Sequence, residues 1–296
     1  MQQKQILALG FFDGVHAGHG ALLRQCRELA DRLGCRAGAV SFDTHPDALV
    51  YGKAPALINT RADRERLMRD EFHMDNIITL PFDRDMMTMP WQDFVCLLLD
   101  KYHAAGLVCG HDFRFGNRGE GNGEKLTAVC QEAGISCIVV EAQRVDGEVV
   151  SSTRIRELLK AGQMESAVRF LGHPHVLTGK VVPGKQLGRT IGIPTANLLL
   201  PEELLTPRFG VYACLAAVDG KKYPAVTNIG TRPTVSGSGV TVEPWLLDFE
   251  GDLYGKELTL EFYKFLRPEK KFPSLEALQA EIRKNAAEVR EFFEKT

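Results

Sequence analysis

The stretch ALGFFDGVHAGHGALL, residues 8–23, decides how the first half of this chain folds. It joins a short apolar run to a helical pattern and sets His16 and His19 among glycines. Side chains at positions i and i+3 project from one face at the start of a helix. The free backbone N–H groups and the positive dipole end of such a turn favour an anion. The stretch therefore predicts a strand, a turn and a helix that begins at a phosphate.

The residue types at this turn indicate which phosphate chemistry fits. Gly14 and Gly18 let phosphate oxygens approach the backbone closely, where a Cβ would intrude. The imidazoles can donate to a phosphate whose charge grows during displacement, which fits attack on an α-phosphate with pyrophosphate leaving. Two surface histidines on an ordinary helix are the alternative, because H-x-G-H alone is a short motif with many chance matches.

Composition limits the class of protein. The chain has 296 residues, a net charge of −2, and 44% hydrophobic and 25% charged residues, as in soluble globular enzymes. Neither half is basic enough to indicate a nucleic-acid surface, no apolar run approaches the roughly 18 residues of a membrane span, and MQQKQ is not a secretory signal. The seven cysteines form no CxxC pair, which favours reduced thiols and a cytoplasmic location. We expect small-molecule substrates and no nucleic-acid or membrane partner, and the oligomeric state stays open.

Short apolar runs alternate with amphipathic segments along the first half. The runs lie at residues 6–9, 37–42, 77–80, 107–109 and 135–140. Between the first two, apolar residues recur at helical spacing: Leu22, Cys26, Leu29 and Leu33. This alternation predicts a Rossmann-like α/β domain with a parallel sheet covered on both faces. Because ligands bind beyond the carboxyl ends of such strands, the segments after Phe42 and Cys109 should share one rim with His16.

The pattern changes at Gly172, where helical periodicity stops. Short strands and turns follow, including two alternating runs joined by the tight-turn pair Asp219-Gly220. A last helix is expected over roughly residues 274–293. We therefore predict a small antiparallel barrel with a C-terminal helix, and two domains, residues 1–172 and 173–296.

Three further segments of the first half suit a phosphate-bearing ligand. VSSTRIRELL opens with serines that can cap a helix and places arginines in the first turn of that helix. Positive charges at this end of a helix are unfavourable for the helix dipole unless a polyphosphate binds there. CGHDFRFGNRGEGNG, residues 109–123, is a glycine-rich loop whose aromatic and charged residues suit a flat ring and phosphates. SFDTHP, residues 41–46, adds an aromatic ring and an imidazole. Each segment alone also fits a capped helix or an ordered turn.

The second half holds the glycine-rich segment GKVVPGKQLGRTIGIPTANLLLP, residues 179–201. Its loop combines flexible positions with charge for the phosphates of a nucleotide, although no P-loop motif is present: Gly184, Lys185, Gly188 and Arg189. Thr195 and Asn197 lie two residues apart and so face the same way on a strand. Hydroxyl and amide oxygens are hard ligands suited to Mg²⁺ held with phosphates. A plain hairpin with a satisfied asparagine is the alternative.

Glu243 stands in an otherwise apolar strand, VTVEPWLLDF. A carboxylate in that setting needs a partner or a task. A kinase that acts on an alcohol needs a base to take the hydroxyl proton, and Glu243 is the candidate for that role. A structural ion pair with Arg267 is the alternative.

The motifs GFFDGVHAGH, GHDFRFG and SSTRIR resemble the adenylyltransferase module of bacterial bifunctional riboflavin kinase/FAD synthetases, which is similar to the wider H-x-G-H nucleotidyltransferase superfamily. The resemblance implies that His16 and His19 bind the phosphates of ATP and that the FMN phosphate is the nucleophile. It also implies that the β and γ phosphates are held by Ser152, Thr153 and Arg156. Arg154 occupies a position that varies in the family, so we rank it below Arg156.

The same resemblance implies the remaining contacts of this first site. The ATP contacts are Gly10, Phe11, Asp13, Gly14, Gly18 and Asp112. The flavin contacts are Phe42, His45, Pro46 and Phe113. Phe11 departs from the family, where a small or polar residue is more usual, and could alter either side of the pocket.

The order GRTIGIPTANL, GVYA, NIGTRPT, VEPWLLDFEGDLYGKELTLEF and FLRPEKKF resembles the riboflavin kinase module of the same family. It implies a six-stranded barrel that moves the γ-phosphate of ATP to the ribityl 5′-hydroxyl of riboflavin. In that module Thr195 and Asn197 would lie near Mg²⁺, and Glu243 would be the base. Residues 209–212 and the segment RPEKKF would line the flavin end, Tyr212 and Arg267 among them. Two departures concern the flavin pocket: Pro244-Trp245 replaces a commoner Thr-His pair, and Asn285 stands where Asp is frequent.

Three other interpretations stay open. In the first, one module is inactive because of Phe11 or Pro244-Trp245. In the second, the chain is a flavin-binding regulator without turnover, although Glu243 and the H-x-G-H, S-S-T and P-T-A-N motifs would then have no task. In the third, it transfers nucleotidyl groups to another acceptor such as tRNA, which its near-neutral charge and its barrel half disfavour. Measuring whether pyrophosphate or ADP is released with each candidate substrate distinguishes these interpretations.

Overall fold

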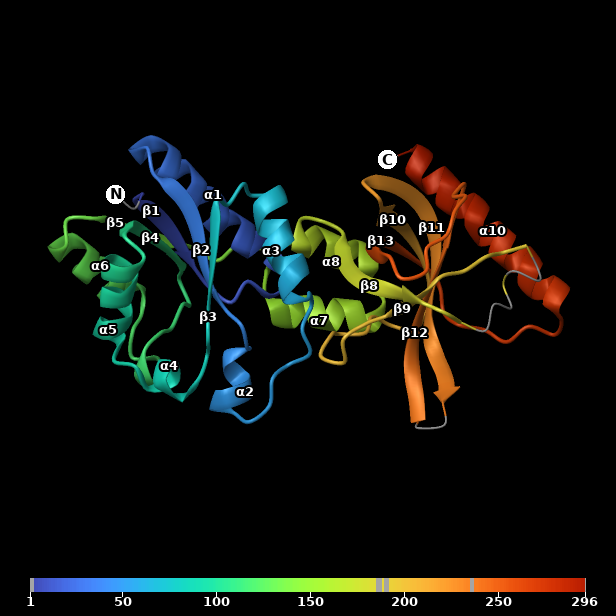
Figure 1. Cartoon of the computed structure of the whole chain (residues 1–296), viewed down its shortest axis with the longest axis horizontal. Coiled ribbons are helices and arrows are strands. Elements are labelled where there is room, and N and C mark those ends of the chain that lie inside the picture. The colour runs from blue at the N-terminus through green and yellow to red at the C-terminus, as the bar shows by residue number, and fades with distance from the viewer. Residues whose placement is uncertain (1–2, 185–187, 189–191, 235–236, 296) are drawn as a thin grey trace. The chain divides into compact units, whose positions relative to one another are not determined.

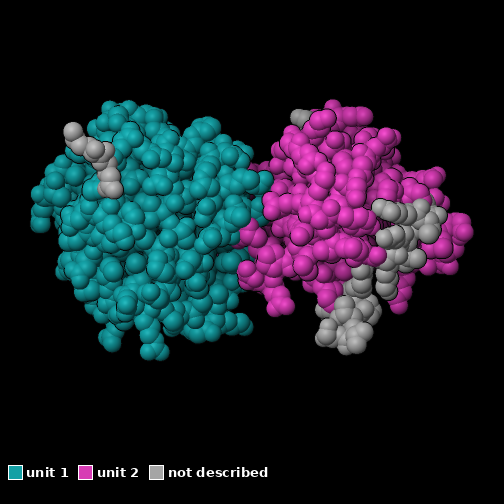
Figure 2. Space-filling view, viewed as in Figure 1, with its two compact units in different colours: residues 1–57, 61–152 teal, residues 58–60, 153–296 magenta. Residues whose placement is uncertain are grey.

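The computed structural model describes residues 3–184, 188, 192–234 and 237–295, so Lys185 and Arg189 lie outside the described residues. The chain divides into two compact units (Figure 2), one of residues 1–57 and 61–152 and the other of residues 58–60 and 153–296. Each unit contains a sheet of its own. The functional boundary expected after residue 172 stays a prediction.

The first unit is built on a five-stranded parallel sheet in the order β3-β2-β1-β4-β5 (Figure 1). The central strand β1 is buried along its whole length and pairs with β2 on one side and β4 on the other. The predicted parallel α/β architecture is therefore confirmed. The strands are β1 (Gln5–Leu9), β2 (Arg36–Phe42), β3 (Asn76–Leu80), β4 (Ala104–Gly110) and β5 (Ser136–Val140).

Helices connect these strands. The first helix packs on β1, β2 and β4 through Leu22, Cys26 and Leu29, as the spacing predicts. Leu33 is 48% exposed, because the helix ends there and Gly34 turns the chain away in left-handed backbone. The helical elements are α1 (Ala17–Leu33), α2 (Pro46–Val50), α3 (Arg61–Asp70), α4 (Arg84–Thr88), α5 (Trp91–Cys96) and α6 (Gly123–Glu132), with the short η1 (Asp13–Val15), η2 (Leu97–Lys101) and η3 (Asn117–Gly119).

The strand order of this sheet reverses between β1 and β4. The chain passes from β1 outward to β2 and β3, then returns past β1 to place β4 and β5 on the other side. At such a switch point, the segments that leave neighbouring strands diverge and open a crevice at the carboxyl ends. The segments that leave β1 and β4 carry GFFDGVHAGH and GHDF, so the topology brings these two motifs to one rim.

Short elements follow the sheet. A two-stranded ribbon comes first, and two helices come next: β6 (Arg144–Val145), β7 (Glu148–Val149), α7 (Ser152–Ala161) and α8 (Met164–Leu171). Helix α8 ends at Gly172, which has a φ of 81° and supplies the predicted stop. This helix packs on two strands of the second unit, β8 and β13.

The second unit contains a closed six-stranded barrel in the order β10-β11-β12-β9-β8-β13, and β13 returns to pair with β10. Every pairing in it is antiparallel, as predicted. The strands are β8 (His175–Val182), β9 (Asn197–Leu199), β10 (Gly210–Val218), β11 (Lys221–Thr234), β12 (Gly237–Leu246) and β13 (Glu257–Arg267).

The expected turn and final helix are both present in this unit. Asp219 and Gly220 join β10 to β11 with φ values of 50° and 75°, the geometry of a tight hairpin turn. Helix α10 (Leu275–Glu294) begins after Ser274, whose hydroxyl accepts the N–H of Ala277 at 3.2 Å. Its apolar face packs on β10 and β11, which confirms a barrel covered by a C-terminal helix.

Candidate active sites

A cavity of about 210 Å³ opens at the carboxyl ends of the strands in the first unit. It joins the start of α1 to the segments after β4 and β5 and to the residues before α7. The predicted residues that it brings together are His16, Gly18, His19, Asp112 and Ser152. His111, which also lines it, is a residue that the sequence analysis missed, although it stands inside the quoted GHDF motif.

The turn between β1 and α1 has an unusual backbone. Phe12 and Val15 are not glycines, yet they adopt left-handed φ values of 61° and 42°, and Gly14 between them has a φ of 81°. This conformation is costly for a β-branched residue and persists only where the surroundings impose it. The ring of Phe12 is fully buried, and a Cβ on Gly10 would lie 3.2 Å from it. The packing of this apolar anchor therefore holds the turn in place.

His16 starts helix α1. Its Nδ1 accepts the backbone N–H of His19 at 3.2 Å, as the capping side chain of a helix does. A nitrogen that accepts cannot carry the proton, so the neutral ring bears its proton on Nε2. His16 thus caps the helix with one nitrogen and keeps an N–H donor on the other.

His19 is a half-buried, neutral partner of His16. Burial, followed by the proximity of His16 and Arg64, lowers the pKa of His19 well below its ordinary value. Its Nδ1 is buried and has no hydrogen-bond partner among the residues that the structure describes. An imidazole in this setting supplies hydrogen bonding without adding a positive charge near neutral pH.

Two contacts tie the neighbouring segments to this turn. Ser152 Oγ donates to the carbonyl oxygen of Asp13 at 2.9 Å. A Cβ on Gly18 would lie 3.1 Å from the ring of His16, so a side chain there would crowd the imidazole. The predicted roles of Ser152, Asp13 and Gly18 thus fall on residues that contact one another or the capping histidine.

The predicted flavin contacts lie near the ends of β2 and β4. Phe42 is buried in the core, and Pro46 opens α2, where His45 Nδ1 accepts the N–H of Asp47 at 3.2 Å. Phe113 stacks on Phe115 with ring centroids 5.5 Å apart. None of the four predicted residues is part of the described lining of the 210 Å³ cavity, so their flavin contacts stay predictions.

Thr153 and Arg156 lie in the first turns of α7 and are grouped with the second unit. Thr153 is exposed and Arg156 is half-buried. The neighbouring Arg154 pairs with Glu157 at 3.2 Å across one helical turn. The rank of Arg154 below Arg156 and phosphate binding by Thr153 and Arg156 stay predictions.

The second unit holds a larger cavity, of about 450 Å³, between the barrel and α10. Its polar lining comes from the segment before β9, from β11, β12 and β13, from the segment after β13 and from α10: Thr195, Asn228, Glu243, Arg267, Glu269, Lys270 and Asn285. Its apolar lining includes Trp245 and the α10 residues Leu278 and Ile282. An apolar cavity with a few convergent polar groups is the usual form of a small-molecule site. Asn228, Leu278 and Ile282 are residues that the sequence analysis missed, because the cavity forms only when α10 covers the barrel.

Glu243 lies on β12, directly opposite Asn228 of β11. The alternative role for Glu243 was an ion pair with Arg267. In the structure Arg267 Nε instead lies 3.4 Å from Glu281 Oε1 and donates to Asn285 Oδ1 at 3.1 Å. Helix α10 therefore engages the guanidinium of Arg267, and Glu243 lines the cavity.

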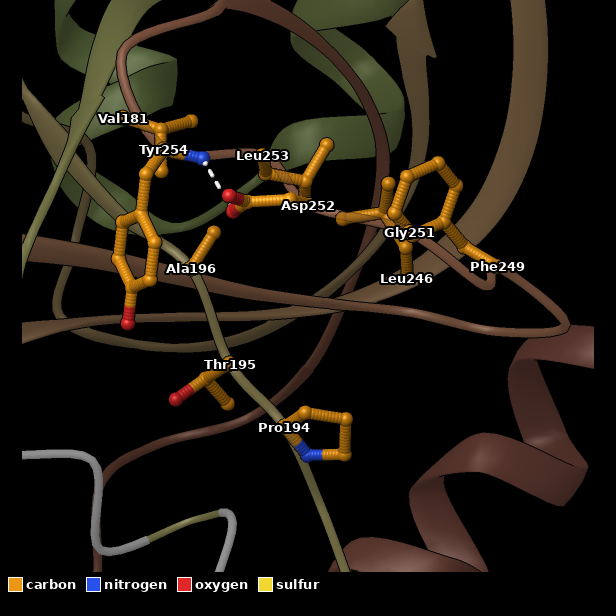
Figure 3. Close-up of a pocket in the computed structure, with 10 residues that line it drawn as sticks. All are labelled: Val181, Pro194, Thr195, Ala196, Leu246, Phe249, Gly251, Asp252, Leu253 and Tyr254. Carbon is orange, nitrogen blue, oxygen red and sulfur yellow. Dashed lines mark hydrogen bonds between the residues drawn. The ribbon is translucent and has the colours of Figure 1, made fainter.

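The P-T-A-N segment lies beside its glycine-rich loop. A Cβ on Gly184 would lie only 2.1 Å from Asn197 Nδ2, and one on Gly188 would lie 3.3 Å from Thr195 Oγ1. Thr195 lines the larger cavity and also a smaller one of about 80 Å³ (Figure 3), which the turn at residues 251–254 closes from the other side. In that turn the N–H of Tyr254 is bonded to Asp252 Oδ1 at 3.0 Å. The predicted Gly184, Gly188, Thr195 and Asn197 thus converge.

Tyr212 does not lie at either cavity of this unit. Its side chain is fully buried, its hydroxyl donates to the carbonyl oxygen of Arg208, and its ring meets Phe262 and Phe265 edge-on. Its alternation along β10 turns the ring into the barrel interior. The structure gives Tyr212 a packing role, and its flavin contact stays a prediction.

A divalent cation is implied by the kinase chemistry, and the donors present suit Mg²⁺. The hydroxyl of Thr195 and the amide oxygen of Asn197 are hard oxygen donors, and the Asn197 amide lies where a Cβ on residue 184 would stand. Within the described part of the chain, no group of three or more His, Cys, Asp or Glu side chains could hold a metal.

No helix among the described residues is long and apolar enough to cross a membrane.

Comparison with known proteins gives a consistent result for both units. Residues 1–154 match the FAD synthetase family, and residues 171–293 match the riboflavin kinase family.

Relatives match along nearly the whole chain. The bifunctional riboflavin kinase/FMN adenylyltransferase of Listeria monocytogenes is 33% identical over 296 residues, which cover 98% of this chain and 93% of that protein. Its counterpart in Escherichia coli K12 is 36% identical over 295 residues, covering 99% and 94%. A crystal structure described as a macrolide-efflux protein from Streptococcus pneumoniae has a TM-score of 0.88 at 28% identity and covers 98% and 95% of the two chains. With both sets of motifs, both folds and full-length relatives in agreement, the chain belongs to the bifunctional riboflavin kinase/FMN adenylyltransferase family.

Proposed function

We propose that the two activities of this family divide between the halves of the chain, with residues 173–296 phosphorylating riboflavin and residues 1–172 adenylylating FMN. The chain converts riboflavin to FMN and FMN to FAD, with ATP as co-substrate in both reactions. The observation that carries the division is the presence of two separate cavities, each lined by one of the two motif sets.

In the first half, an oxygen of the FMN phosphate attacks the α-phosphorus of ATP. A new O–P bond forms, the bond to the bridging oxygen of the β-phosphate breaks, and pyrophosphate leaves. Nε2–H of His16 and the free N–H groups at the start of α1 supply donors for the charge that develops. Neutral His19, stacked on His16, keeps that ring in place.

The remaining assignments of this site are also part of the proposal. Nucleotide contacts are assigned to Gly10, Phe11, Asp13, Gly14, Gly18 and Asp112, and contacts to the β and γ phosphates to Ser152, Thr153 and Arg156. Flavin contacts are assigned to Phe42, His45, Pro46 and Phe113. The bond from Ser152 to Asp13 and the shared cavity of His16, Asp112 and Ser152 support the nucleotide assignments.

In the second half, the ribityl 5′-hydroxyl attacks the γ-phosphorus of ATP, and ADP leaves. Glu243 accepts the hydroxyl proton, which its position at the 450 Å³ cavity supports. Trp245 and the apolar face of α10 would cover the flavin ring beside Arg267. Thr195 and Asn197 would hold Mg²⁺, which when bound neutralises charge on the phosphates. The loop residues Gly184, Lys185, Gly188 and Arg189 are assigned to the nucleotide.

We also place the protein in the cytoplasm. All seven cysteines are free thiols, and Cys26, Cys109, Cys130 and Cys214 are buried. Buried reduced thiols suit a reducing compartment.

A time course tests the division of labour. The purified chain is incubated with riboflavin, ATP and Mg²⁺, and flavins, ADP and pyrophosphate are measured together. FMN should appear first with ADP, and FAD should follow with pyrophosphate. FMN that accumulates alone would mean an inactive first half, and FAD formed only from added FMN would mean an inactive second half. Flavin binding without any product would instead support the regulator.

A further inference from the structure

Arg64 is a buried cation that none of the motifs explains. It lies on α3, a helix rich in charged residues, yet only 2% of its surface is exposed. Its Nη2 donates to the carbonyl oxygen of Phe42 at 3.2 Å. Its Nε and Nη1 are buried without a hydrogen-bond partner among the described residues. A buried guanidinium with two unsatisfied nitrogens costs free energy, so its retention is not explained by stability alone.

The guanidinium lies against the turn that carries H-x-G-H. Helix α3 packs on η1, and Arg64 Cζ stands 4.2 Å from the centroid of the Phe11 ring. The same ring meets His45 at a steep angle, with centroids 4.6 Å apart. Phe42 ends β2, and Phe11 follows β1. Arg64 therefore bridges the ends of two neighbouring strands at the catalytic rim.

The guanidinium of Arg64 also interacts electrostatically with groups of the H-x-G-H turn. Burial lowers the pKa of Arg64, and the carboxylate of Asp13, itself 2% exposed, raises it. Arg64 is also one of the causes that lower the pKa of His19, after burial and His16. The charged and titratable groups that bear on this cluster are Asp13 of η1, His16 and His19 of α1, His45 beside Phe11, and Arg61 and Glu65 of α3.

We propose that Arg64 is a positioning residue of the adenylyltransferase site, whose guanidinium clamps the Phe11 ring and the end of β2 against the H-x-G-H turn. The inference rests on the proposed adenylyl transfer by the first half of the chain. Because Arg64 is buried, it acts through Phe11 and the turn and does not contact the substrate. A clamp of this kind keeps the N–H donors of the turn where charge develops, and small displacements of such donors are costly for the rate.

The charge of Arg64 has a second consequence, which separates positioning from simple packing. A cation beside the half-buried imidazole of His19 disfavours a second positive charge. Removing the cation should let His19 become protonated at higher pH. Protonated His19 would place a charge against the ring of His16 and disturb the stacked pair. The acid limb of the pH–rate profile therefore reports on Arg64.

The test compares Arg64→Met with Arg69→Met. Both arginines lie on α3, but the side chain of Arg69 is 50% exposed and pairs with Glu65 at the surface. FAD formation from FMN and ATP is measured between about pH 5 and 9, and riboflavin kinase activity is measured in the same samples. Arg64→Met should lower kcat/KM for adenylylation by about 10- to 100-fold and move the acid limb to higher pH. Kinase activity and the Arg69→Met enzyme should stay within about twofold of wild type.

Arg64→Lys supplies a second, independent measurement. Lysine keeps the charge but lacks the planar group that stacks on Phe11, so kcat/KM should fall while the acid limb stays in place. The proposal is overturned if Arg64→Met keeps the wild-type kcat/KM and acid limb, or if its loss of activity leaves the acid limb unchanged. If Arg64→Met does not fold, wild-type kcat/KM in Arg64→Lys overturns it. A wild-type enzyme that makes no FAD would instead contradict the proposed function.

Discussion

The imidazole rings of His16 and His19 are stacked, with centroids 3.6 Å apart and planes inclined by 13°. Nδ1 of His16 accepts the backbone N–H of His19, so the same residue caps α1 and keeps an N–H donor on Nε2. Capping and phosphate binding are therefore two functions of a single side chain. Substitution can separate them, because other residue types also cap helices.

His16→Asn and His16→Ala should differ in stability but agree in activity. Asparagine is a good N-cap and should keep the free energy of unfolding, whereas alanine should lower it by about 1 kcal/mol. Both lack the Nε2 donor, and both should lose adenylyl transfer by about 10²- to 10³-fold. Urea denaturation and FAD formation measure the two effects. Wild-type activity in His16→Asn would contradict the role of Nε2–H.

Glu243→Gln should remove kinase activity and leave adenylyl transfer intact. The amide keeps the shape of the side chain but cannot accept the hydroxyl proton, so FMN formation should fall by at least about 10²-fold. FAD formation from supplied FMN should stay within about twofold of wild type. Glu257→Gln, an exposed glutamate on β13, is the matched control and should retain both activities. Retention of FMN formation in Glu243→Gln would exclude Glu243 as the base.

Gly184→Ala should disturb the proposed metal donors of the kinase. The added Cβ would lie 2.1 Å from Asn197 Nδ2, so Asn197 or the loop must move. A displacement of about 1 Å at such a position can cost about 10²-fold in rate, and we expect a loss of kcat/KM for MgATP of about 10- to 100-fold. Gly255→Asn is the control, since Gly255 has a φ of 75° with no neighbour within 4 Å and asparagine tolerates that backbone. Equal kinetics in the two variants would argue against the contact.

His175→Phe should stabilise the barrel. His175 is fully buried, and neither ring nitrogen has a hydrogen-bond partner in the described part of the chain. Phenylalanine keeps the ring that packs near Phe262 and removes the unsatisfied atoms, so the free energy of unfolding should rise by about 1–3 kcal/mol. Urea denaturation followed by Trp245 fluorescence, in a Trp91→Phe background, measures it. A lower urea midpoint would contradict the expectation.

The same residue gives a pH dependence with a defined sign. Burial, with a smaller effect of His173, lowers the pKa of His175 from 6.5 to about 3. Between about pH 6.5 and 3, His175 is therefore protonated in the unfolded chain and neutral in the folded chain. The free energy of unfolding decreases as pH falls through this range, by up to about 1.4 kcal/mol per pH unit. The difference in stability between wild type and the H175F variant should grow over this range. A constant difference would mean that His175 titrates normally.

Much of the fold followed from local patterns. Apolar runs separated by amphipathic segments predicted the parallel sheet, and alternation with the Asp219-Gly220 turn predicted the barrel, because each pattern depends on neighbours a few residues apart. The rule that ligands bind at the carboxyl ends of parallel strands predicts that His16 and the segment of Asp112 share one rim. Leu33, which the helical spacing assigns to the apolar face of α1, is exposed because it is the last residue of that helix.

Other parts of the sites could not be predicted in this way. Tyr212 stands in a motif of the second half, yet its ring points into the barrel. Leu278 and Ile282 become cavity residues only because α10 lies over the barrel. Arg64 belongs to a helix whose sequence resembles any solvated surface helix, and nothing in its spacing indicates that it is buried.

The sequence by itself therefore determined the two architectures, the family and the residue types of both reactions, since strand, turn and motif patterns are local. Only the tertiary structure decided which glutamate engages Arg267 and that a buried guanidinium lies behind the H-x-G-H turn. The physical reason is that burial and hydrogen-bond partners arise between segments far apart in the chain.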